Sequence, residues 1–159
     1  MNQQQQQQQH DDEYRVYIIE NVRYALAHSL ILGVLRMVPN QPFHVVASHW
    51  RECLTHISEL CSVHWVHKRK TNGAQHGHVM YLETFHCHCA GSYVTQQTVR
   101  TQKPTKKCNC PGVLKVTILT ANPTECKFEL LADHDKHTPG DVDDANTLKL
   151  TGKTFDKMF

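Results

Sequence analysis

Three segments determine the expected fold: FHCHC at residues 85–89, KKCNCPGVLKVTIL at residues 106–119 and ADHDKHTPGD at residues 132–141. Two clusters of thiols are followed by a strand-like segment and then by a pair of histidines. A structural zinc site needs four soft or borderline ligands of this kind, brought together from distant points in the sequence. We therefore expect the rest of the chain to act as a scaffold for such a site, or as a surface that the site positions.

Alternating side chains around these clusters predict strands. Residues 64–70 and 78–87 lie on either side of an Asn-Gly turn signal, so we expect them to pair as a hairpin. Residues 112–119 alternate between apolar and polar side chains, and residues 126–132 return after an Asn-Pro turn. The sequence thus predicts a four-stranded antiparallel sheet with one face covered by helices.

Two helices are predicted upstream of the sheet. Apolar side chains recur every three or four positions over residues 14–30, and this amphipathic helix should end before Pro39. A second helix is expected over about residues 45–60. Cys53 and Cys61 fall near it and are expected to pack in the core, as buried thiols commonly do. The predicted fold class is α+β, with two N-terminal helices and a four-stranded antiparallel, zinc-bound sheet.

Composition divides the chain into four parts. Residues 1–11 are a polyglutamine arm that we expect to be disordered, residues 12–61 a helical region, residues 62–141 a zinc-binding β domain, and residues 142–159 an acidic C-terminal tail. The N-terminus lacks a signal-peptide pattern, and no apolar stretch is long enough to span a bilayer, so we expect an intracellular protein without membrane contact. Thiols inside cells stay reduced, which favours metal binding as the use of 7 Cys and 13 His.

Strand ends supply the expected metal ligands. Cys87 ends the second predicted strand, Cys110 starts the third, and the pair His134 and His137 follows the fourth. In an antiparallel sheet these ends can meet at one edge, so that one Zn²⁺ ion ties them together and contributes to folding. Four residues of the same clusters are alternative or competing ligands: Cys89, Cys108, His86 and His88.

The middle of the chain is strongly basic. Residues 61–120 carry eight Lys and Arg against Glu83 alone, a net charge of +7, whereas the segments before and after carry −2 and −3. Such a block is the electrostatic footprint of a polyanion-binding surface. The residues expected to contact phosphates or bases lie on the first strand and in the loop between the cysteine clusters: Lys68, Arg69, Lys70, Arg100, Lys103, Lys106 and Lys107.

Three features over residues 62–141 carry a family resemblance. They are an aromatic residue two positions before a cysteine (Phe85, Cys87), a Cys-Pro start to an alternating strand (CPGVLKVTI, residues 110–118), and a closing histidine followed by proline in HDKHTPG (residues 134–140). Their order resembles the zinc-finger superfamily that joins plant WRKY domains, glial-cells-missing factors, FLYWCH fingers, and the N-terminal domains of Mutator-like transposases and far-red-impaired-response proteins.

The resemblance implies both a ligand set and a DNA-binding mode. In that superfamily the matching positions hold zinc, which implies the ligands Cys87, Cys110, His134 and His137. The first strand of WRKY proteins enters the DNA major groove, which would place Trp65, His67 and the basic residues 68–70 at bases or phosphates. WRKYGQK itself is absent, the histidines are spaced H-x-x-H where H-x-H is commoner, and the loop between the cysteines is long. The long loop favours the transposase-derived branch.

The sequence therefore predicts a zinc-dependent DNA-binding domain of a nuclear protein, transposase-derived or transcription-factor-like, with duplex DNA as partner. The alternative is a protein-interaction module that self-assembles, for example as a homodimer, through the apolar N-terminal helix and binds no nucleic acid. Four protein ligands would close the coordination sphere of the ion, and the sequence has no nucleophile motif and no phosphate-binding Gly-rich loop. We therefore expect no enzymatic activity and no small-molecule substrate.

Overall fold

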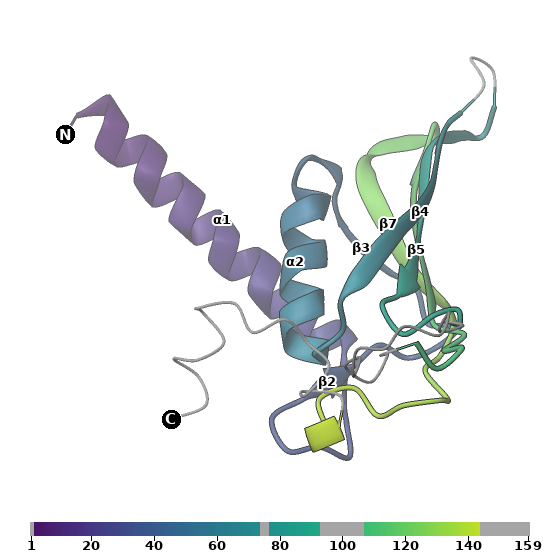
Figure 1. Ribbon diagram of the computed structural model, residues 1–159. Coiled ribbons are helices and arrows are strands. Elements are labelled where there is room, and N and C mark those ends of the chain that lie inside the picture. The colour runs from purple at the N-terminus through teal and green to yellow at the C-terminus, as the bar shows by residue number, and fades with distance from the viewer. Residues whose placement is uncertain (1, 74–76, 93–106, 144–159) are drawn as a thin grey trace, which may run out of the picture.

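The structure, a computed structural model, describes residues 2–73, 77–92 and 107–143, without the side chains of residues 11, 14–19 and 21. It is a mixed helix-and-sheet fold, with a five-stranded antiparallel sheet in the order β3-β7-β6-β5-β4 and a two-stranded sheet β1-β2. Helix α2 lies beside the larger sheet, whereas α1 extends away from it (Figure 1). In chain order the elements are α1 Gln3–Ala25, β1 Ala27–His28, β2 Leu35–Arg36, β3 Phe43–Val46, the 3-10 helix η1 Ala47–His49, α2 Trp50–Cys61, β4 Trp65–Asn72, β5 Val79–Cys87, β6 Val113–Leu119 and β7 Asn122–Ala132.

The larger sheet has one strand more than the sequence predicted. The four predicted strands correspond to β4, β5, β6 and β7, but β3 occupies a segment that we expected to form a connection and the start of a helix. β3 pairs with β7, and the ring of Phe43 stacks on that of Phe128 with centroids 5.5 Å apart. A strand of four residues is too short to show a clear alternation, and its partner lies far along the chain, so no local pattern indicates it.

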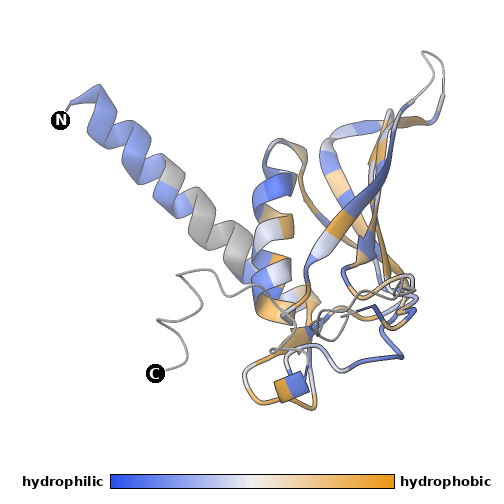
Figure 2. Cartoon of the chain, viewed as in Figure 1, coloured by the Kyte–Doolittle hydropathy of each residue, from blue (hydrophilic) through white to orange (hydrophobic). Residues whose placement is uncertain are grey.

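Helix α1 also differs from the prediction at both ends. It begins at Gln3, so the glutamines predicted to be disordered are helical, in keeping with the good helix propensity of glutamine. It ends at Ala25 rather than near Pro39, because the next residues form the β1-β2 hairpin, whose connection includes Gly33 with a φ of 81°. The first turns of α1 are hydrophilic (Figure 2). None of the described helices is long and apolar enough to cross a membrane.

The core lies between α2 and one face of the sheet. Residues three or four positions apart on α2 are buried, as an amphipathic helix requires: Trp50, Cys53, Ile57 and Cys61. They join one buried cluster with inward-facing side chains of the strands: Phe85, Leu114, Val116, Phe128 and Leu130. Both helix cysteines are therefore core residues, which confirms that prediction. Ser62, with a φ of 52°, ends the helix in a left-handed conformation, and the chain then turns into β4.

The opposite face of the sheet carries charge. Lys115 of β6 lies beside Glu129 of β7, with Nζ 3.9 Å from the carboxylate, and Lys127 lies 3.7 Å from the same group. These residues alternate along their strands with the core residues, so they point the other way. The sheet therefore has one face in the apolar interior and one face on the polar surface. Functional side chains from different strands can converge at the strand ends.

Candidate metal centre

Four side chains converge at one end of the sheet. Cys87 is the last residue of β5, Cys110 lies three residues before β6, and His134 and His137 follow β7. One ligand atom from each lies within 4.8 Å of all the others. The Cys87 Sγ is 3.2 Å from the Nε2 of His137, and the Cys110 Sγ is 3.3 Å from the Nδ1 of His134. This arrangement of two thiols and two imidazoles can hold a metal ion.

Backbone pairing and one glycine bring the four ligands together. The Cys87 N–H donates to the carbonyl oxygen of Gly112 at 3.0 Å, which holds the end of β5 against the segment that follows Cys110. A Cβ atom on Gly112 would lie 2.9 Å from both Cε1 and Nδ1 of His134, and 3.2 Å from the Cβ of Cys87. Any larger residue at this position would therefore push the imidazole away from the thiols.

Burial determines the electrostatics of the two cysteines. Cys87 is 1% exposed and Cys110 is 4% exposed. Removal from water raises the pKa of both thiols above the ordinary value, because a thiolate loses its hydration there. A bound cation would supply the missing positive charge and deprotonate the thiols. Without a metal ion, burial therefore favours the neutral thiols. With a metal ion bound, the thiolates would be favoured instead.

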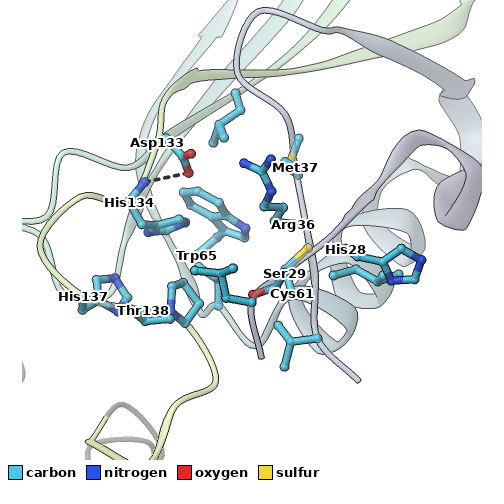
Figure 3. A pocket seen from close by; sticks show the side chains of 16 residues that line it. His28, Ser29, Arg36, Met37, Cys61, Trp65, Asp133, His134, His137 and Thr138 are labelled. Atoms are coloured by element: carbon cyan, nitrogen blue, oxygen red, sulfur yellow. Dashed lines mark hydrogen bonds between the residues drawn. The ribbon is translucent and has the colours of Figure 1, made fainter. Parts of the chain in front are cut away.

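Trp65 is buried, whereas the predicted DNA contact requires it to face the solvent. It is the first residue of β4, pairs with Cys87 and is only 8% exposed. Its ring lies against His134, with centroids 5.4 Å apart. Figure 3 shows Trp65 beside His134. Both residues line a cavity of about 440 Å³, together with the β1-β2 hairpin and the segment after β7. Trp65 therefore packs against the candidate metal site, and DNA could reach its side chain only if this end of the sheet opened.

The other residues predicted to bind DNA fall into two groups. Lys68, Arg69 and Lys70 are exposed on β4, and the Nζ of Lys70 lies 5.3 Å from the ring centroid of Tyr81. His67 is about half exposed, with Nε2 3.5 Å from the buried carboxylate of Glu83. The Lys107 ammonium donates to the His88 carbonyl oxygen at 3.1 Å, close to the metal site. The remaining predicted contacts lie outside the described residues: Arg100, Lys103 and Lys106.

The buried carboxylate of Glu83 is a feature that the sequence analysis missed. Its side chain accepts a hydrogen bond from the Tyr81 hydroxyl and lies 3.4 Å from the Arg51 guanidinium of α2. Burial, followed by the hydrogen bond to Glu83, raises the pKa of Tyr81 to about 12. The alternating pattern of β5 could have indicated this position, because Glu83 falls on the same face as Phe85 and Cys87.

The four competing ligands separate in the structure. His88 and Cys89 form a second group with Cys87, whose ligand atoms also lie within 4.8 Å of one another. Cys108 and His86 belong to neither group among the described residues. No disulfide joins any of the described cysteines.

Comparisons with known proteins leave the fold and the site as the guides to function. No protein-family model matches the chain, and neither a curated protein nor a solved structure matches it.

Proposed function

We propose that this chain is a zinc-dependent DNA-binding domain of a nuclear protein, related to the transposase-derived branch of the WRKY-like zinc fingers. The observation that carries the proposal is the convergence of Cys87, Cys110, His134 and His137 at the end of a sheet whose edge strand is basic. Two thiolates and two imidazoles form a donor set that suits tetrahedral Zn²⁺. With all four positions filled by protein, the ion serves a structural role.

The ion would act as a clip between distant segments. Cys87, Cys110 and the two histidines belong to three parts of the chain, so stretches of 22 and 23 residues must close as loops when the four ligands meet. Closing these loops costs conformational entropy that zinc binding offsets, so metal binding and ordering of the sheet end are coupled. The β4-β5 hairpin pairs through Trp65 and Cys87 at the clipped end, so the ion also fixes the position of β4.

The DNA-binding surface of the proposal is β4. Among the described strands it lies at the edge of the sheet and pairs with β5 alone, and a bulge between His67 and Arg69 interrupts its ladder. Three consecutive cations on this edge, Lys68, Arg69 and Lys70, can contact the phosphates of a duplex, and a β-ribbon is narrow enough to enter the major groove. Lysines also occur on edge strands because they prevent pairing between sheets. A binding measurement separates these two roles.

The test is fluorescence anisotropy of a labelled duplex of mixed sequence over a range of salt concentrations. The zinc-loaded chain is compared with a triple variant, Lys68→Gln, Arg69→Gln and Lys70→Gln, and with a control variant, Lys115→Gln and Lys127→Gln, on the open sheet face. We expect the log–log salt slope of the edge variant to shrink by about 0.9 for each phosphate that the variant no longer neutralises. The control keeps the slope of the parent chain, and chelator abolishes binding. Binding that is indifferent to both chelator and the edge variant contradicts the proposal.

A further inference from the structure

Three consecutive buried residues follow one another at the end of β5. Cys87, His88 and Cys89 are 1%, 5% and 3% exposed. Their ligand atoms lie within 4.8 Å of one another, and the Nδ1 of His88 is 3.9 Å from the Cys87 Sγ. Neighbouring side chains of a strand point to opposite faces, so this convergence needs an explanation from the backbone.

A turn provides that explanation. β5 ends at Cys87, and the Ala90 N–H donates to the Cys87 carbonyl oxygen at 2.9 Å, which reverses the chain. The Cys89 N–H points back at the Cys87 Sγ, 3.5 Å away. The Cys89 carbonyl oxygen in turn accepts hydrogen bonds from the N–H groups of Cys108 and Cys110, at 3.0 and 3.2 Å. These bonds hold the backbone of Cys89 against that of Cys108 and Cys110, and the turn brings a further buried thiol, that of Cys89, beside Cys87.

Charge is the second observation. One zinc ion bound by the thiolates of Cys87 and Cys110 and by two neutral imidazoles is already electrically balanced. The thiols of Cys89 and Cys108 are therefore not needed to neutralise that ion. The thiolates of Cys87, Cys89 and Cys110 together neutralise three of the four positive charges of two divalent ions, and a thiolate sulfur has lone pairs for two metals. Cys87 belongs to both groups of ligand atoms, so it is the residue that two ions would share.

We infer that the turn after β5 binds a second divalent ion of the zinc class, held by His88, Cys89 and the shared thiolate of Cys87. The inference rests on the proposed function only in taking the first ion as present. It requires one local change. The His88 Nδ1 accepts a long hydrogen bond, 3.3 Å, from the His64 N–H. A neutral imidazole has one nitrogen that can accept, so metal binding at either ring nitrogen replaces this bond.

The test is to titrate Zn²⁺ into the metal-free, reduced full chain and to count the bound ions by native mass spectrometry. We expect two ions for the parent chain. Cys89→Ser, a change of similar volume, leaves one ion, and His88→Ala gives the same result or weakens the second binding step at least tenfold. The matched control is Cys126→Ala, which removes a buried thiol from the core and keeps two ions. In the parent chain loaded with ¹¹³Cd²⁺, two cadmium resonances are expected, and Cys89→Ser removes one.

The outcomes separate this inference from the proposed function. One ion in the parent chain, or two ions in Cys89→Ser, overturns the second site and leaves the first intact. Zero ions in the parent chain overturns both. Loss of only one ion in His134→Ala supports two distinct sites, because the remaining ion then has the ligands of the turn.

Discussion

Two groups of buried cysteines differ in what surrounds them. Cys53, Cys61 and Cys126 lie in the core between α2 and the sheet, with apolar neighbours, whereas Cys87 and Cys110 lie at the end of the sheet within reach of two imidazoles. Burial is equally complete in both groups. The comparison teaches that burial alone does not make a thiol a metal ligand. A buried thiol can serve as a metal ligand only where other ligand atoms converge with it, and that convergence depends on where each strand ends.

The largest difference between the groups is expected on loss of a metal ligand. Cys110→Ser replaces a thiolate by a hydroxyl that binds zinc poorly. Structural zinc contributes on the order of 10 kcal/mol in small domains, and a domain of this size is stable by only about 5–15 kcal/mol. We therefore expect the variant to lose the first ion and the ordered sheet end, measured by zinc content and near-ultraviolet circular dichroism. A fully folded Cys110→Ser variant without zinc would contradict the claim that this thiol stabilises the fold through a bound ion.

A smaller effect is expected where the ligands are crowded but intact. In Gly112→Ala the added Cβ meets the His134 ring at 2.9 Å, so the imidazole has to shift. We expect a loss of about 1–3 kcal/mol in unfolding free energy, together with weaker zinc binding in a competition assay with a chromophoric chelator. Gly91→Ala is the control. Its φ is 79° and its added Cβ meets no atom within 4 Å, so it strains the backbone without affecting zinc affinity.

The buried core thiols should make the unfolding free energy depend on pH in the alkaline range. Burial raises the pKa of Cys53 from 9.0 to about 11, and that of Cys126 from 9.0 to about 12. A raised pKa in the folded state gives stability that is complete below pH 9 and is lost as the pH rises toward the folded values. We expect unfolding free energy to fall between about pH 9 and 12, and to fall less steeply in Cys126→Ala. Equal pH dependence of the unfolding free energy in the parent chain and in Cys126→Ala would contradict a raised pKa of the Cys126 thiol in the folded state.

The smallest effect is expected for a core cysteine at neutral pH. Cys53→Ala removes one sulfur atom from the apolar interface of α2, a cost of roughly 1 kcal/mol in a urea titration. Its zinc content should equal that of the parent chain, so it serves as the matched control for Cys110→Ser. Any loss of zinc in Cys53→Ala would show that the two groups of cysteines are coupled.

Features that depend on local patterns could be predicted from the sequence. The alternation in 112–119 indicated β6, and placing ligands at strand ends selected the four residues that the structure brings together. The four side chains converge because an antiparallel sheet constrains which strand ends meet, whatever the conformation of the segments between them. The identity of the ion and the binding of DNA stay predictions.

Features that depend on distant partners could not be predicted. β3 exists because β7 lies beside it, and its four residues carry no pattern of their own. Trp65 precedes a basic run, which suggests a DNA contact, yet its register opposite Cys87 directs it inward. The apolar period of α1 continues past Ala25, where the β1-β2 hairpin replaces the helix. The prediction of a homodimer rests on seven apolar side chains, of which Tyr14, Tyr17 and Ile18 lie outside those described.

The most direct test of the proposed metal clip is amide hydrogen exchange, monitored by NMR, of the zinc-loaded chain and of the chain from which a chelator has removed zinc. The Cys87 N–H, bonded to Gly112, and the Cys110 N–H, bonded to Cys89, report on the clipped end of the sheet. With zinc bound, both amides should exchange slowly. Chelator should accelerate their exchange by more than tenfold, and adding zinc back should make the exchange slow again. Equal protection of these two amides with and without metal would contradict the account.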